Sequence, residues 1–187
     1  MRISKLVRRF KMASMITCPH AANEEVYMCG EFDLFVDRVD PRYQSHVSEI
    51  HSELMKRGCR LEMKTAKSGF VVSYIRKDTK RTLATFVQRK SGIKLRVFAD
   101  HIAEFQELLN AFPRRMKTEI RKASVCKRLL DPNDCNPRCR MGYTFVMERE
   151  QYQKCRYMAF LLTLNEESHP YILQLLHKEL DRVDSES

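Results

Sequence analysis

The chain has 187 residues, a length that suits one domain or at most two small ones. Hydrophobic residues make up 43% and charged residues 31%, so a core can form and disorder is not expected. The formal net charge is +10. No run of about 18 apolar residues is present and no apolar segment follows the basic N-terminus, so we expect neither a transmembrane helix nor a signal peptide.

The positive charge is concentrated in the middle of the chain. Residues 56–156 carry 25 basic and 10 acidic side chains, whereas residues 157–187 carry 2 basic and 6 acidic ones. Such a field favours nucleic acid, nucleotides or the acidic face of a protein as partners. Ordinary solubility charge is the alternative interpretation.

The N-terminal part is predicted to be an arm followed by two helices. Residues 1–30 show no apolar period, and we expect a variable basic arm outside a single domain of residues 31–183. A short helical segment is expected at Phe32–Val39. Asp40-Pro41 is typical of the start of a longer helix, which Gly58 ends. The apolar residues of this helix recur at helical spacing: Val47, Ile50 and Leu54.

Strand patterns follow this helix. Alternating apolar and polar residues, with β-branched and aromatic side chains, predict four strands: Arg60–Lys64, Phe70–Arg76, Arg81–Arg89 and Ile93–Ala99. Because the loops between them are short, we expect an antiparallel four-stranded meander with one buried face.

Two helices are predicted after the strands. Asp100 is a good N-cap for a helix that carries apolar residues at Ile102, Phe105, Leu108 and Leu109. Pro113 starts the second helix, which we expect to end at Cys126.

The C-terminal part is predicted to contain a loop, a hairpin and a closing helix. Asp131–Gly142 is rich in Pro and Asn and is expected to be a loop. Tyr143–Met147 and Tyr152–Leu164 are expected to pair as a β-hairpin, and Asn165 to cap the last helix. The predicted fold class is therefore α+β, an antiparallel four-stranded meander plus a β-hairpin with about four packing helices. A lone hairpin is only marginally stable, so we expect it to extend the sheet or pack on it.

Basic, hydroxyl and aromatic side chains follow the predicted meander. They provide the materials for phosphate contact and base stacking on one sheet face. A solvated polar face is the alternative. The candidate anion-binding residues, which Phe98 would accompany, are Lys64, Lys67, Ser73, Tyr74, Arg76, Arg89, Lys94 and Arg96.

The cysteines point to a metal site. The chain has 7 of them and no export signal, so a reducing compartment with free or metal-bound thiols is expected. Four of them, Cys126, Cys135, Cys139 and Cys155, fall within a cysteine-rich subregion, residues 126–157. Four thiolates are the usual donor set of structural zinc, and nearby Lys and Arg side chains would offset its negative charge. The alternatives are buried thiols acting as small apolar groups, or a redox or iron–sulfur role.

Motifs for catalysis are sparse. The sequence has no phosphate-binding Gly-rich loop, no Gly-x-Ser-x-Gly elbow and no His-Glu-x-x-His pair. Cys126 with His101 or His169 leaves a Cys–His nucleophile open. Cys18-Pro19-His20 with Cys29 is a poor chelating arrangement, and Cys59 is most simply a core residue. We therefore expect a binding protein rather than an enzyme.

Several segments resemble a known family. They are Ala66–Tyr74, Thr85–Lys90, Ala123–Leu129, Cys135–Tyr143 and Tyr152–Tyr157. Together they resemble a family of small uncharacterised proteins from Firmicutes, chiefly clostridial bacteria, over roughly residues 30–180. The resemblance implies a bacterial, cytoplasmic protein and an N-terminal extension outside the shared domain. It implies no activity, but the family pattern contains all four cysteines of the subregion.

These observations predict a non-enzymatic binding module for nucleic acid or another anionic ligand, stabilised by a structural zinc ion. The alternative is a small-molecule sensor, or an enzyme acting on a small anion in a pocket between sheet and helices, using Lys67, Tyr74, Arg89 or Arg96. A third possibility is a basic face that meets an acidic protein. No membrane partner is expected, and the oligomeric state is left open.

Overall fold

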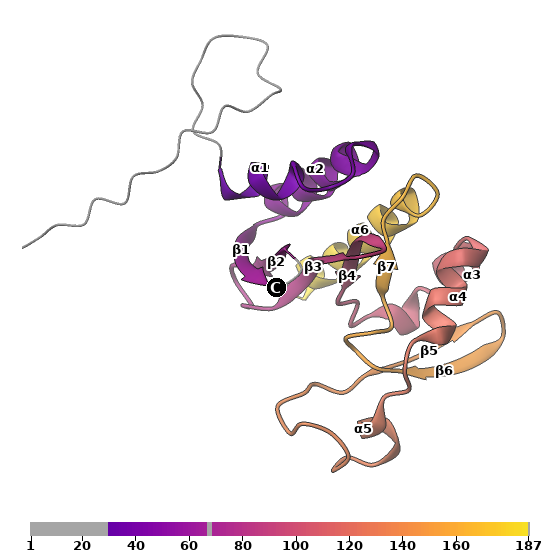
Figure 1. Cartoon of the computed structure of the whole chain (residues 1–187). Helices are drawn as coiled ribbons and strands as arrows, with labels where there is room; N and C mark the ends of the chain where they lie inside the picture. Colours follow the sequence, from indigo (N-terminus) through magenta and orange to yellow (C-terminus); the bar gives the residue numbers. More distant parts are fainter. Residues whose placement is uncertain (1–29, 67–68, 187) are drawn as a thin grey trace, which may run out of the picture.

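The computed structural model describes residues 30–66 and 69–186 (Figure 1). The helices are α1 Glu31–Val36, α2 Pro41–Lys56, the 3-10 helix η1 Ile102–Glu104, α3 Gln106–Ala111, α4 Arg114–Lys122, α5 Lys127–Leu130 and α6 His169–Ser185. The strands are β1 Cys59–Ala66, β2 Gly69–Arg76, β3 Thr82–Arg89, β4 Gly92–Val97, β5 Tyr143–Met147, β6 Glu150–Lys154 and β7 Leu161–Thr163. The α+β class is confirmed, with more helices in this part of the chain than the four expected.

The first two helices form where the sequence predicts them. Pro41 occupies the first position of α2, and the Asp40 side chain accepts a hydrogen bond from the Arg42 N–H at 3.1 Å. The predicted apolar residues of α2 are buried. Gly58 follows the helix with a φ of 78°, a left-handed conformation that glycine adopts without strain.

The main sheet is antiparallel with the strand order β1-β2-β3-β4-β7. The predicted meander of β1 to β4 is confirmed. The fifth strand, β7, adds to its edge, with Leu162 paired to Leu95. The predicted single strand Tyr152–Leu164 is wrong. The Cys155 carbonyl accepts hydrogen bonds from Met158 and Ala159 at 3.0 and 2.9 Å, and this turn separates β6 from β7.

The two faces of the sheet differ. Cross-strand partners share a face, so one face carries apolar residues in register, of which all but the half-buried Met63 are buried: Met63, Val72, Phe86, Leu95 and Leu162. This core face belongs to one buried cluster with α1, α2 and α6. The opposite face carries the polar and basic residues together with Val71 and Val87, and α4 lies along its β7 edge (Figure 1). We call it the basic face.

In the second half of the chain, three predicted helix ends are wrong. The helix after the strands is broken into η1 and α3, and Asp100 does not cap it because its carboxylate pairs with Arg81 and Arg156. Cys126 precedes α5 as its N-cap residue instead of ending a helix. The last helix has Ser168 in the N-cap position, one turn after the expected Asn165.

The β5–β6 hairpin forms a separate two-stranded sheet. Tyr143 and Phe145 each bring their ring within 5.5 Å of the Phe160 ring, between centroids. The hairpin therefore packs on the domain and does not extend the main sheet. In the described ranges, no helix has the length and apolar character needed to cross a bilayer.

A buried charge network joins α6 to the sheet. The Glu179 side chain, in a residue only 1% exposed, accepts hydrogen bonds from Arg81, from the Asp100 and His101 backbone and from the His101 ring. Asp100 also contacts Arg156, which is itself buried. Every one of these charges has an opposite charge beside it, which fits a structural role.

Candidate functional site

The sheet register brings five of the predicted anion-binding residues onto the basic face. Ser73, Thr85 and Arg96 form one cross-strand row, and Lys64 and Lys94 lie in a neighbouring row. Arg89 follows on β3 with the same alternation. The five are Lys64, Ser73, Arg89, Lys94 and Arg96. Lys67 lies outside the described residues.

Tyr74 and Arg76 were wrongly assigned to this face. Consecutive strand residues point to opposite faces, so both lie with the core, on the side away from Ser73. Tyr74 is 0% exposed and its hydroxyl lies 3.0 Å from Nδ1 of His51, and burial raises its pKa. Arg76 is buried and pairs with Asp78 and Asp184. Neither side chain is available to an external anion.

Two of the lysines on the basic face are already paired. Lys64 lies 2.6 Å from the Glu62 carboxylate. Lys94 donates to Glu119 and to the Thr163 hydroxyl, both at 2.8 Å. Burial alone would raise the pKa of Glu119, but the hydrogen bonds from Lys94 and Thr163 outweigh it and lower the pKa. This pair ties α4 to the sheet and leaves little free charge on Lys94.

Arg96 and Arg89 are different, because no carboxylate pairs with either in the part of the chain that the structure describes. Arg96 donates from Nε to the Tyr157 carbonyl at 2.8 Å, and its guanidinium lies 5.6 Å from the centre of the Tyr157 ring. Desolvation lowers its pKa, and the nearby charge of Arg89 lowers it further. An anion beside the two guanidiniums would relieve this repulsion.

Tyr157 is an exposed aromatic side chain next to Arg96. It is 47% exposed and meets the ring of Phe98 edge-on, with centroids 5.7 Å apart. Phe98, expected on the working surface, is buried at 7% exposure. Sequence reasoning missed Tyr157 because it was assigned to the middle of a long strand, whereas it lies in the turn before β7.

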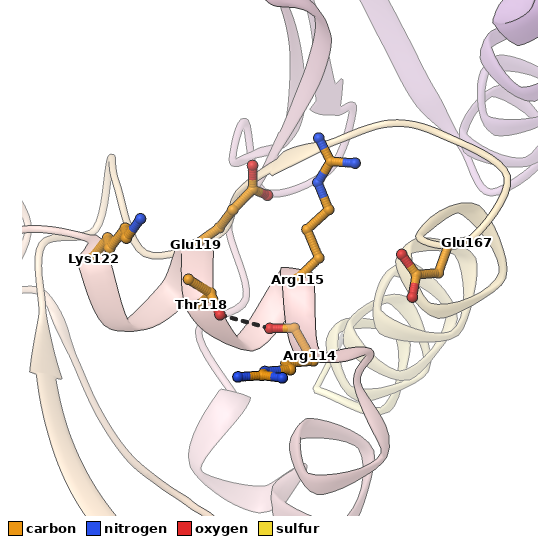
Figure 2. A pocket seen from close by; sticks show the side chains of 6 residues that line it. All are labelled: Arg114, Arg115, Thr118, Glu119, Lys122 and Glu167. Atoms are coloured by element: carbon orange, nitrogen blue, oxygen red, sulfur yellow. Dashed lines mark hydrogen bonds between the residues drawn. The ribbon is translucent and has the colours of Figure 1, made fainter.

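A shallow hollow continues the basic surface along α4 (Figure 2). Its volume is about 500 Å³, and it is lined by Arg114, Arg115, Thr118, Glu119, Lys122 and Glu167. Figure 2 shows Arg115 and Glu119 extending from α4 to the same side, with Glu167 facing them from the loop before α6. Because Glu119 also binds Lys94, this hollow borders the basic face of the sheet.

Arg115 connects this hollow to a second one. The second hollow has a volume of about 380 Å³ and lies at the β3–β4 turn, where Arg38 and Lys90 also line it. Within residues 30–66 and 69–186, Arg114, Arg115 and Lys122 have no ion-pair partner. Sequence reasoning missed them, although the α4 sequence RRMKTEIRK buries only Met116 and Ile120 and so leaves its cations outward.

The four cysteines of the subregion lie near one another. Burial raises the pKa of Cys139, and the thiols of Cys135, Cys155 and Cys126 raise it further. Cys135 is exposed and Cys126 is buried. As the side chains stand, however, no three His, Cys, Asp or Glu of the described ranges form a group that could hold a metal ion.

The remaining candidates do not assemble. His101 lies between Glu179 and Glu186, and His169 stacks on His46, so neither histidine contacts Cys126. Cys59 is buried in the core, as expected. Cys18, His20 and Cys29 lie outside the described residues. The geometry gives no support to a Cys–His nucleophile.

No family model, curated protein or solved structure matches the chain. The resemblance to a clostridial family therefore stays a prediction, and the functional argument rests on the residues themselves.

Proposed function

We propose that the protein is a non-enzymatic binding module for nucleic acid, using the basic face and the adjoining surface of α4. The observation that carries this proposal is the pair of arginines, Arg89 and Arg96, which have no carboxylate partner among the described residues, with the exposed ring of Tyr157 beside Arg96. Guanidinium groups suit phosphate oxygens, and an exposed aromatic ring suits an unpaired base.

The extent of the surface favours a polymer over a small ligand. Unpaired cations occur on β3, on β4 and on α4, and Arg115 links the two hollows. A chain of phosphates can contact all of these groups in succession, whereas a single small anion cannot. Five phosphate contacts with a single strand would give a slope of log K against log salt of about −3.5.

The test is fluorescence anisotropy with a labelled single-stranded oligonucleotide over a range of salt concentrations. The variant is Arg89→Gln with Arg115→Gln, because one residue reports on the sheet and the other on α4. We expect weaker binding and a slope that is shallower by about 1.4, the value for two lost phosphate contacts. Both side chains are exposed, so the fold should be retained.

The matched control is Lys56→Gln with Lys178→Gln, which makes the same change in net charge on α2 and α6. These exposed lysines belong to the helices that cover the core face. The control should leave the slope unchanged. Equal losses in both variants would mean that net charge alone drives binding, and no binding at low salt would refute the proposal outright.

A sensor or enzyme for a small anion is the second candidate. The α4 hollow favours it, because about 500 Å³ is the size of a small-molecule site and Arg114, Arg115 and Lys122 line it. Inorganic phosphate or a nucleotide would then raise the melting temperature by mass action, and Arg115→Gln would abolish the rise. A rise without oligonucleotide binding would favour this candidate.

We also propose a cytoplasmic location for the protein. All five cysteines of the described residues are free, which fits a reducing compartment.

A further inference from the structure

The loop at residues 131–142 has no apolar anchor of its own. Its residues are exposed or at most half-buried, and they form neither helix nor strand. The apolar residues at its borders, Leu130 and Met141, are 69% and 51% exposed. Ordering a loop costs conformational entropy, and burial of apolar surface does not offset that cost here. Polar contacts attach this loop to the rest of the chain, among them the ion pair of Arg140 with Asp100.

The backbone brings two of the four cysteines together at the base of the loop. Val125 and Lys154 form an antiparallel bridge. On either side of it, the Cys126 N–H donates to the Gln153 carbonyl at 3.3 Å and the Cys155 N–H to the Ser124 carbonyl at 2.8 Å. Cys126 and Cys155 are therefore held on neighbouring backbone segments by main-chain hydrogen bonds.

The end of the loop returns to the same place. The Gly142 N–H donates to the Cys126 Sγ at 3.2 Å. A Cβ at position 142 would lie 2.5 Å from the Cys126 Cβ and 2.8 Å from its Sγ, so only glycine permits this approach. Arg128 donates to the Cys139 carbonyl, which fixes the second half of the loop against α5.

The remaining two cysteines complete the set. Cys135 and Cys139 are separated by three residues, and the Cys139 N–H donates to the Asn136 carbonyl at 2.9 Å, which closes a turn between them. The contact of Gly142 with Cys126 places the end of this segment, three residues after Cys139, at the base of the loop. The backbone thus brings the three separate segments that carry the four cysteines to the base of the loop.

We propose that Cys126, Cys135, Cys139 and Cys155 bind one zinc ion as a structural tetrathiolate centre, which anchors loop 131–142 to the base of the β5–β6 hairpin. This site is distinct from the proposed nucleic-acid surface and does not depend on it. Four thiolates satisfy the tetrahedral preference of zinc, with Zn–S bonds of about 2.3 Å. The N–H···S bond from Gly142 is the kind of outer contact that orients a metal-bound thiolate.

Binding requires an inward movement of the loop. Cys135 is exposed, and no group of three donors is assembled in the described chain as it stands. Such movement is ordinary, because metal sites are seldom fully formed without the ion. The four thiols lose their protons on binding, giving a centre of charge −2 that the exposed side chain of Arg138 helps to neutralise.

The first experiment is metal analysis of the full chain, purified under reducing conditions without a chelator. We expect about one equivalent of zinc, released when a mercurial reagent blocks the thiols. Replacement by Co²⁺ should give the visible ligand-field bands and the sulfur-to-metal charge-transfer bands of tetrahedral tetrathiolate coordination. Less than about a tenth of an equivalent of any metal overturns the proposal.

The second experiment uses variants of the exposed ligand. Cys135→Ser removes a thiolate without touching the core, and we expect zinc affinity to fall more than about a hundredfold, since loss of mere outer contacts already costs 10 to 100-fold. Cys135→His supplies another zinc ligand and should restore most of the binding. Cys59→Ala, which changes a cysteine in the core, should keep the full equivalent.

Other outcomes overturn the proposal. A disulfide between any two of the four cysteines in the reduced preparation would do so. An iron–sulfur absorption spectrum would assign the cysteines to a different centre. Equal zinc binding by Cys135→Ser and the unaltered chain would show that the ion sits elsewhere. None of these results depends on whether the protein binds nucleic acid.

Discussion

Glu179 offers the sharpest test of how the domain is held together. We expect Glu179→Gln to destabilise the fold strongly, because Glu179 is 1% exposed and carries the negative charge that faces Arg81. Its oxygens also accept the Asp100 and His101 backbone N–H groups at 2.9 and 3.1 Å. Glutamine has nearly the same shape, so the effect reports on charge and hydrogen bonding more than on packing.

The magnitude follows from two losses. Removing one partner of a buried ion pair costs about 3–5 kcal/mol. The amide NH₂ of the glutamine must face N–H donors, which leaves at least one buried donor unpaired. An unpaired buried donor costs about 1–3 kcal/mol, and this cost overlaps with the loss of the ion pair. We therefore expect the free energy of unfolding to fall by about 3–5 kcal/mol, out of a typical total of 5–15 kcal/mol. For a chain of this length, the melting temperature should fall by roughly 6–20 °C.

The assay is urea denaturation followed by circular dichroism, with a thermal scan beside it. The matched control is Asp181→Asn on the same helix, where the Asp181 side chain is 66% exposed and pairs with Arg57. A surface ion pair contributes about 0–1 kcal/mol, so the control should change little. If Glu179→Gln costs less than about 1 kcal/mol, the buried network does not hold α6 to the sheet and the reasoning is wrong.

Two further predictions concern the loop and the histidines. Gly142→Ala should loosen loop 131–142, seen as faster amide exchange and proteolysis there, because the added Cβ would collide with Cys126; unchanged protection would contradict this. Burial lowers the pKa of His51 below 6.5, although the charge of Asp33 opposes this shift. Burial also lowers the pKa of His169 below 6.5; the charge of His46 lowers it further, and that of Glu49 opposes the shift. The folded state thus takes up fewer protons, so stability is full above pH 6.5 and should fall as the pH drops below it. Urea denaturation from pH 7.5 to pH 5 measures this, and His51→Gln with His169→Gln should flatten the curve.

Local sequence patterns were enough to predict the meander. The alternation in β1 to β4 and the short loops between them determine both pairing and direction. Because consecutive strand residues point to opposite faces, Ser73 and Tyr74 cannot lie on the same face of the sheet. Placing both there was an error that the sequence itself could have corrected. The break before β7 had no comparable signal, since Tyr157–Leu164 is almost continuously apolar.

Contacts between distant segments could not be predicted in this way. Arg81 and Glu179 are 98 residues apart, and no periodicity relates them. For the cysteines, residue types alone gave a candidate set whose metal binding stays a prediction. The proximity of the segments that carry them depends on the Val125–Lys154 bridge and on the contact of Gly142 with Cys126. The sequence of α4 indicates that only Met116 and Ile120 face the core, so the outward direction of its cations could have been predicted. Only the structure places these cations beside the sheet.

The position of β7 has a consequence for how the chain folds as it is synthesised. β4 and β7 are neighbours in the sheet, yet Lys94 and Thr163 are 69 residues apart, and α3, α4, the cysteine loop and the hairpin all lie between them. Until β7 emerges, the outer edge of β4 has no partner and offers a template for wrong pairing. Any cross-link within the segment between β4 and β7 shortens the loop that must close before these two strands can pair. A bound metal would therefore hasten completion of the sheet, and cells short of that metal would accumulate chains with an open edge.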